Sequence, residues 1–319
     1  MEKLLMLSRR EFHTLSALTS MTANAPVRTF AFEWWDVFTT QPLSGNQLAV
    51  FPDARGLTDA EMQRIAREMN LSETTFVLPR DKATEASQGI KVRIFTREQE
   101  ILFGGHPALG TACALRERAG DRVTLDLSVG PVLVTFSKQP NGLVFGDMLQ
   151  TDPVFAETHD AAQIAPLLGL RLDDLDINVP IQNVSTGRPN LMVMLRSLEA
   201  IRRLKVSWND VRTYFSSWDD QRGFYVMTRE VETPGVFLHA RKPTSAQEDP
   251  ATGSAAGCAI AWLVRQGLVD SGRRVRFEQG IEMKRPGELH VSAVKTAGRI
   301  HEVRVGGYCV RLMQGTLTL

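Results

Sequence analysis

The 319-residue sequence is poor in cysteine, with only Cys113, Cys258 and Cys309. The number is odd and no two of them have Cys-x-x-Cys spacing, which argues against a disulfide framework. No group of His, Cys and acidic residues has the spacing of zinc ligands either. We therefore expect a protein that works without a structural metal, a catalytic metal or another cofactor.

The sequence also lacks a long apolar run and an excess of charge of one sign. No stretch approaches the roughly 20 apolar residues of a membrane-spanning helix. Lys and Arg total 37 against 36 Asp and Glu, so no net charge draws the chain to nucleic acid or to anionic lipid. With 43% hydrophobic residues it can bury a full core. We expect a soluble globular protein with neither nucleic acid nor membrane as a partner.

Residues 1–26 are expected to form a leader outside the fold. Arg9 and Arg10 precede a weakly apolar stretch from Leu15 to Met21, and this resembles a twin-arginine export signal. The apolar stretch is short, so we expect a cytoplasmic protein with a disordered leader, with export as the alternative. The ordered chain should begin near Val27.

Strand-like segments outnumber helical ones, which favours an α+β fold over a doubly wound parallel sheet. Phe30 to Phe38 is expected to be the first strand. A Thr58-x-x-Glu61 capping box predicts a helix that ends near Asn70. Leu198 to Phe215 is expected to be one helix, and Tyr308 to Leu319 a strand pair that turns at Gly315.

Two segments, 105–112 and 248–255, align without a gap, with His106 opposite Asp249, Pro107 opposite Pro250 and Gly110 opposite Gly253. Each opens an apolar helix and has a strand-like run before and after it. We interpret this as a duplicated α/β unit. The predicted halves are residues 27–147 with 308–319, and residues 148–307.

In each copy a polar residue stands directly before a proline and a helix start. Free N–H groups and the positive end of the helix dipole then favour a bound carboxylate. If the halves pack around a pseudo-twofold axis, His106 and Asp249 approach each other across a cleft, with the amides of Gly110, Gly253 and Ser254 near the same anion. A helix start with small packing residues is the alternative for each motif alone, and Asp249 could be only an N-cap.

Glu73 lies at the entrance of a strand among apolar neighbours. Burial there would raise its pKa toward the range useful for general acid/base catalysis. From spacing alone, Glu73 could equally pair with an Arg or face water. Arg188 and Arg241 could each bind a second substrate carboxylate or be surface charges.

Four motifs together resemble the PhzF (phenazine biosynthesis) family in order and spacing. They are Gly45-Asn46-Gln47-Leu48-Ala49-Val50, Ser72-Glu73-Thr74-Thr75-Phe76, Gly105-His106-Pro107-Ala108-Leu109-Gly110 and Glu248-Asp249-Pro250-Ala251-Thr252-Gly253-Ser254. The resemblance extends from about Thr29 to the C-terminus. It implies a diaminopimelate-epimerase-like fold of two pseudo-symmetric halves, each with strands wrapped around a central helix, and a homodimer.

The resemblance also implies site residues. Glu73 would be the general acid/base that isomerises trans-2,3-dihydro-3-hydroxyanthranilate, and His106 and Asp249 would assist proton movement. The expected substrate-binding residues are Asn46, Ser72, Gly105, Gly110, Gly253 and Ser254. Related racemases carry Cys where this chain has His106 and Asp249, so a two-thiol racemase is not expected.

The predicted function is a cofactor-independent isomerase that moves a proton on a small carboxylate-bearing substrate. Two alternatives remain open. One is an amino-acid or hydroxy-acid epimerase with Glu73 and either His106 or Asp249 as opposing bases. The other is a non-catalytic protein that binds small acids.

Overall fold

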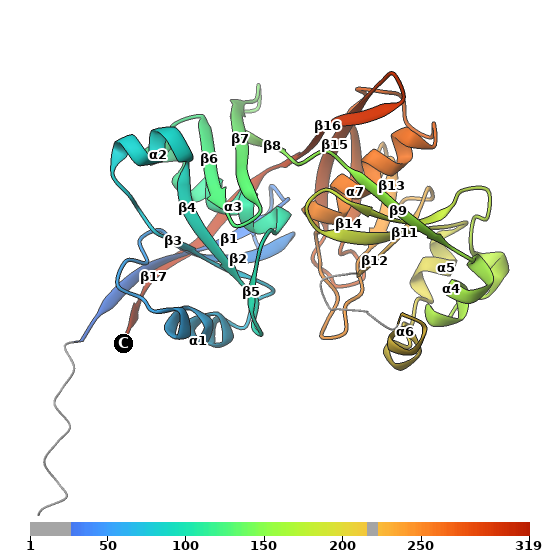
Figure 1. Ribbon diagram of the computed structural model, residues 1–319, viewed down its shortest axis with the longest axis horizontal. Helices are drawn as coiled ribbons and strands as arrows, with labels where there is room; N and C mark the ends of the chain where they lie inside the picture. Colours follow the sequence, from blue (N-terminus) through green and yellow to red (C-terminus); the bar gives the residue numbers. More distant parts are fainter. Residues whose placement is uncertain (1–26, 216–222) are drawn as a thin grey trace, which may run out of the picture.

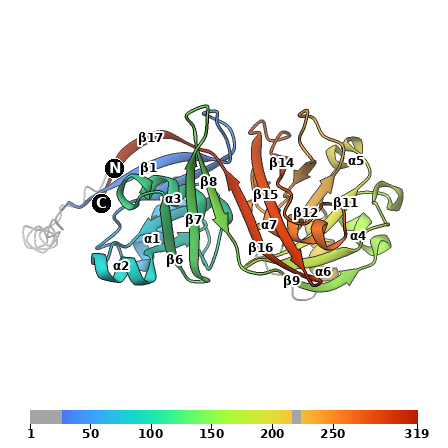
Figure 2. The ribbon, with the colours of Figure 1, turned by 90° about the horizontal axis from the view of Figure 1, so that it is seen from above.

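The computed structural model describes residues 27–215 and 223–319, so the predicted leader lies outside the described residues. Two lobes of mixed strands and helices lie side by side (Figure 1). The chain builds the lobe with α1 to α3 first and the lobe with α4 to α7 second, and its last strand returns to the first lobe (Figures 1 and 2). In the described ranges, no helix combines the length and the apolar character needed to cross a membrane.

The first half combines the N-terminal elements with the C-terminal strand. Its strands are β1 (Thr29–Val37), β2 (Asn46–Phe51), β3 (Thr74–Val77), β4 (Ile90–Phe95), β5 (Glu100–Ile101), β6 (Arg122–Leu127), β7 (Gly130–Lys138), β8 (Val144–Leu149) and β17 (Cys309–Thr318). Its helices are α1 (Asp59–Met69), α2 (Lys82–Gln88) and α3 (Gly105–Ala119).

The second half is continuous in sequence. Its strands are β9 (Val154–His159), β10 (Ile181–Ser185), β11 (Pro189–Leu195), β12 (Gly223–Thr228), β13 (Leu238–Arg241), β14 (Val275–Gln279), β15 (Gly287–Thr296) and β16 (Arg299–Gly307). Its helices are α4 (Ala161–Leu167), the 3-10 helix η1 (Leu172–Asp174), α5 (Leu198–Arg202), α6 (Trp208–Tyr214) and α7 (Gly253–Arg265).

Strand pairing is the same in the two halves. In the first, the order is β17-β1-β2-β3-β4-β6-β7-β8, and in the second it is β9-β10-β11-β12-β13-β14-β15-β16. Each series reads antiparallel, antiparallel, parallel, antiparallel, parallel, antiparallel, antiparallel. β17 therefore takes the place in the first half that β9 takes in the second, which is the pattern of a duplicated unit. β8 pairs with β16 and joins the two series, so the residue boundaries predicted for the halves stay a prediction.

Each half wraps its strands around one central helix. α7 is buried from Gly253 to Val264, and α3 is buried through its first two turns, from Gly105 to Ala112. Small side chains let the strands approach these helices closely, since a Cβ on Gly110 would lie 2.6 Å from Leu48. Both helices are held among strands on several sides, which fixes the position of their N-termini.

The capping-box prediction is confirmed, but two predicted elements are wrong. Thr58 and Glu61 cap α1, and Asn70 ends it in the left-handed conformation. Tyr308 to Leu319 is not a strand pair, because Gly315 lies inside β17 opposite Phe32. A Cβ at Gly315 would lie 2.8 Å from the Phe32 ring, so this glycine makes room for an aromatic side chain rather than a turn.

Leu198 to Phe215 is not one helix but two, α5 and α6. The backbone N–H groups of Lys205 and Ser207, between them, donate to the carbonyls of Leu168 and Leu167 at 3.0 and 2.9 Å. These partners lie at the end of α4, so a tertiary contact takes the hydrogen bonds that a continuous helix would need.

Candidate active site

A cavity of about 360 Å3 opens where the two halves meet. The first half contributes Ser72, Glu73 and the segment 96–99, and the second contributes Arg188, the segment 242–249 and Ser254. A larger hollow of about 630 Å3 lies beside α2 and β6 within the first half and contains none of the predicted site residues. The cavity between the halves therefore defines the candidate site.

The N-termini of the two central helices meet beside this cavity. A Cβ added to Gly105, the first residue of α3, would lie 2.4 Å from the backbone nitrogen of Ser254 in α7. The N-cap residues Gly104 and Thr252 make no side-chain capping hydrogen bond. Two uncapped helix N-termini thus lie side by side, which suits a carboxylate.

His106 is the second residue of α3, not a residue before the helix as predicted. Its side chain is 3% exposed, and its Nδ1 atom lies 3.0 Å from the Nδ2 atom of Asn46. The same Nδ2 atom donates to Asp249 Oδ1 at 2.6 Å and to the carbonyl of Ala251 at 2.9 Å. Asn46 therefore connects the two residues that the motif alignment places opposite each other.

Asp249 stands before α7, but it is not the N-cap, which is Thr252. The hydroxyl of Thr252 donates to Asp249 Oδ2 at 2.6 Å. Gln279 holds the segment between them extended, because its Nε2 donates to the carbonyl of Asp249 and its Oε1 accepts from the amide of Thr252. These bonds delay the helix start to Gly253, so the two aligned motifs differ in backbone conformation.

Glu73 lies directly before β3 and is 9% exposed. Burial, helped by the negative charge of Asp249, raises the pKa of Glu73 to about 8. Burial also lowers the pKa of His106 to about 4, and Asp249 opposes this only in part. His106 Nε2 lies 3.5 Å from Glu73 Oε2, so near neutral pH the two side chains face each other as an uncharged pair.

The chain is similar to known proteins over most of its length. The family model described as phenazine biosynthesis-like protein (PhzC-PhzF) matches residues 35–315. The chain belongs to this family. An uncharacterized isomerase of Mesorhizobium japonicum is 34% identical over 297 residues, covering 89% of this chain and 97% of the relative. A trans-2,3-dihydro-3-hydroxyanthranilate isomerase of Pseudomonas fluorescens is 34% identical over 285 residues, covering 89% and 98%.

A solved structure of the PhzF family, from Bacillus anthracis, matches with a TM-score of 0.81 and 28% identity, covering 92% of this chain and all of that one. The predicted PhzF membership and fold are thereby confirmed, and the relatives confirm the enzyme class, an isomerase. Within the described residues, no three His, Cys, Asp or Glu side chains gather so that they could hold a metal ion.

The residues predicted from the PhzF motifs take four kinds of position. Ser72, Glu73, Asp249 and Ser254 line the cavity, while Asn46 and His106 are buried. Gly105 and Gly253 lie at the contact between the two helix N-termini. Gly110 packs against Leu48 and Val37 and does not line the cavity, so its predicted role in substrate binding has no support in its position.

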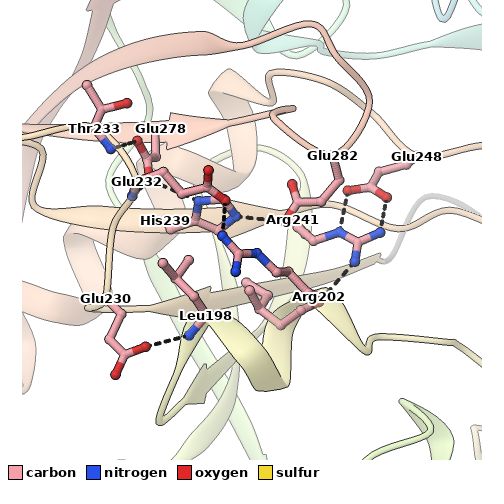
Figure 3. Close-up of polar contacts among 11 residues, drawn as sticks. Leu198, Arg202, Glu230, Glu232, Thr233, His239, Arg241, Glu248, Glu278 and Glu282 are labelled. Atoms are coloured by element: carbon pink, nitrogen blue, oxygen red, sulfur yellow. Dashed lines mark hydrogen bonds and ion pairs between the residues drawn. The ribbon is translucent and has the colours of Figure 1, made fainter.

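Arg241, one of the two arginines considered for a second carboxylate, is already engaged. Its guanidinium makes two hydrogen bonds to Glu248, at 2.9 and 2.6 Å, and a third to the carbonyl of Ile201 (Figure 3). Beside it, the His239 imidazole lies between Glu278 and Glu282 at 3.0 Å from each (Figure 3). This network anchors the strand and loop that carry Asp249.

Lys242 lines the cavity but was missed from the sequence. It is 6% exposed, and a lysine side chain is rarely buried to this extent. Nothing in its local sequence, Arg241-Lys242-Pro243, separates it from a surface lysine. Only the fold brings it next to the PhzF motif residues.

Proposed function

We propose that the protein is a cofactor-independent isomerase that moves a proton along a small carboxylate-bearing substrate, with Glu73 as the general acid/base. One observation carries the proposal: a nearly buried carboxyl group with a pKa of about 8 lines a cavity beside two uncapped helix N-termini. The names of the Pseudomonas relatives support a substrate of the trans-2,3-dihydro-3-hydroxyanthranilate type.

In the proposed reaction the Glu73 carboxylate takes a proton from a carbon conjugated with the substrate carboxylate. The C–H bond breaks, an O–H bond forms on Glu73, and the electron pair spreads into a dienolate. The helix N-termini stabilise the negative charge that develops on the carboxylate oxygens. Glu73 then returns the proton to another carbon on the same face, and the double bond shifts with no net change in atoms or electrons.

His106 and Asp249 support this step in different ways. His106 is neutral at neutral pH, and its Nε2 atom lies 3.5 Å from Glu73 Oε2. It therefore limits the positions that the Glu73 side chain can take. Asp249 holds Asn46 and Thr252 and also lines the cavity, so it can accept a hydrogen bond from a substrate amino or hydroxyl group.

Epimerisation is the second candidate, because Glu73 and Asp249 line one cavity and could act on opposite faces of a carbon. Isomerisation is preferred since both oxygens of Asp249 already accept hydrogen bonds, and Asp249 would have to give one up to take a proton from a substrate. His106 is not a suitable opposing base, since its Nε2 faces Glu73 itself.

The test is a proton NMR screen of the purified protein in deuterated water against trans-2,3-dihydro-3-hydroxyanthranilate and a panel of small amino and hydroxy acids. We expect a double-bond shift with deuterium uptake. Stereocentres that take no part in the shift should keep their configuration. Loss of optical rotation without a bond shift would favour the epimerase. No exchange with any compound, while the acids still bind, would contradict catalysis and favour a binding protein.

A further inference from the structure

Two of the three cysteines are in contact, although they are 196 positions apart in the sequence. The sulfur of Cys113, in the third turn of α3, lies 2.9 Å from the sulfur of Cys309, the first residue of β17. Both are free thiols that pack against the edge of the main core and are partly exposed, so a small oxidant can reach them. Cys258 is fully buried in α7, where its sulfur contacts Thr186 and Asn190 instead.

The strand that carries Cys309 has few other attachments. β17 lies at the edge of the first half, where β1 is the one described strand that pairs with it (Figure 2). None of its ten residues is fully buried. The chain enters it from Gly307, the last residue of β16, so Cys309 lies directly after the crossing from the second half to the first. A covalent bond at Cys309 would hold the strand at the point where the chain enters the first half.

The pair can close by thiol–disulfide exchange with a small disulfide such as oxidised glutathione. Burial and the adjacent Cys113 thiol raise the pKa of Cys309, which favours Cys113 for the first attack. The Cys113 thiolate attacks one sulfur of the small disulfide, and one glutathione leaves. Cys309 then attacks the Cys113 sulfur, and the second glutathione leaves as the protein disulfide forms. The two protein thiols lose two protons and two electrons, which the small disulfide gains as it becomes two thiols.

We propose that Cys113 and Cys309 form a redox-modification site, at which a reversible disulfide fastens β17 to the central helix α3. Because the bond would join residues far apart in the sequence, it would restrict the unfolded chain and stabilise the fold. It would stay open in a reducing compartment and close in an oxidising one. Neither cysteine lines the candidate cavity, so the inference does not rest on the proposed function.

The test starts from the reduced full-length protein, which is treated with excess oxidised glutathione and then freed of it. Titration of thiols after denaturation should find three before the treatment and one after it. The intact mass should show no retained glutathione, because the bond lies within the chain. The thermal unfolding midpoint should rise by roughly 5 °C, as for a disulfide that closes a long loop.

Three cysteine variants locate the effect. Cys113→Ser and Cys309→Ser each remove one partner, and neither should show a higher midpoint after oxidation. Each variant is compared with its own reduced form, so a loss of basal stability does not obscure the result, and either variant suffices if the other does not fold. Cys258→Ala is the matched control: oxidation should take it from two free thiols to none, with the rise in midpoint retained.

Three free thiols after oxidation, or retained glutathione in place of the internal bond, would overturn the inference. So would a rise in midpoint that survives in Cys113→Ser or Cys309→Ser. A bond that closes without raising the midpoint would overturn its role in fastening β17. None of these measurements involves turnover, so a failure of the proposed function and a failure of this inference are distinguishable.

Discussion

His106 Nε2 lies 3.5 Å from Glu73 Oε2, and neither atom has a hydrogen-bond partner among the described residues. Both side chains are nearly buried, so each unsatisfied atom lowers stability by about 1–3 kcal/mol. A fold selected for stability alone would close this gap or fill it with apolar groups. The arrangement suits a site in which a substrate and a moving proton complete the polar contacts.

The first prediction concerns the pH dependence of catalysis. A base must be ionised, and the pKa of Glu73 is raised to about 8, so kcat/KM should rise about tenfold per pH unit below pH 8 and then level off. The pKa of His106, about 4, lies below this range, so His106 adds no further step. Initial rates on the substrate found by NMR, from pH 6 to pH 9, check this. A rate that is flat or falling over this range would contradict Glu73 as the base.

The second prediction links Glu73 to stability. Its pKa in the folded state, about 8, is above the ordinary value of 4.5, so between these values the folded protein binds one proton more than the unfolded chain. Stability then falls with rising pH in this window, by up to about 1.4 kcal/mol per pH unit. His106 acts in the opposite direction only between its folded value of about 4 and its ordinary value of 6.5.

Glu73→Gln removes this proton-binding site and should therefore gain stability over the wild type as the pH rises from 6.5 to 8. We expect a relative gain of roughly 2 kcal/mol across that range. Urea unfolding of both proteins at several pH values measures it. Parallel curves for the two proteins would show that Glu73 is not a buried acid.

The third prediction concerns Asn46, whose amide contacts His106, Asp249 and Ala251. Asn46→Ala leaves buried acceptors unpaired and should lower stability by about 2 kcal/mol. Because the catalytic side chains lose a common support, kcat should fall more than KM rises. Steady-state kinetics and thermal unfolding of the same preparation separate the two effects. Unchanged kcat in a folded variant would limit Asn46 to a structural role.

The fourth prediction concerns the buried His239 between Glu278 and Glu282. Burial lowers the pKa of His239, but the two carboxylates outweigh it and raise the pKa to about 9. The stabilisation is complete below the ordinary value of 6.5 and is lost as the pH rises through 9. His239→Gln should cost about 3 kcal/mol near pH 6 and clearly less above pH 9. Equal losses at both pH values in thermal unfolding would mean that the histidine is not charged.

The two central helices could be predicted from the duplicated motif, because the effect of its Pro, Gly and Ala residues on a helix start depends on neighbouring residues in the sequence. The start of α7 could not be predicted the same way, since Gln279 and Asn46 hold the segment after Asp249 extended from distant parts of the chain. Lys242 became a site residue only through the fold, which places it in the lining of the cavity. The homodimer, the cytoplasmic location and the absence of a cofactor stay predictions.

The central claim is that Glu73 carries the proton, and solvent exchange in a matched pair of variants tests it most directly. Glu73→Gln removes the proposed acid/base, and Glu98→Gln removes a more exposed carboxylate that lines the same cavity. Deuterium uptake into the substrate should vanish in Glu73→Gln and stay within about twofold of wild type in Glu98→Gln, as expected for a surface charge. Undiminished uptake in a folded Glu73→Gln protein would contradict the account.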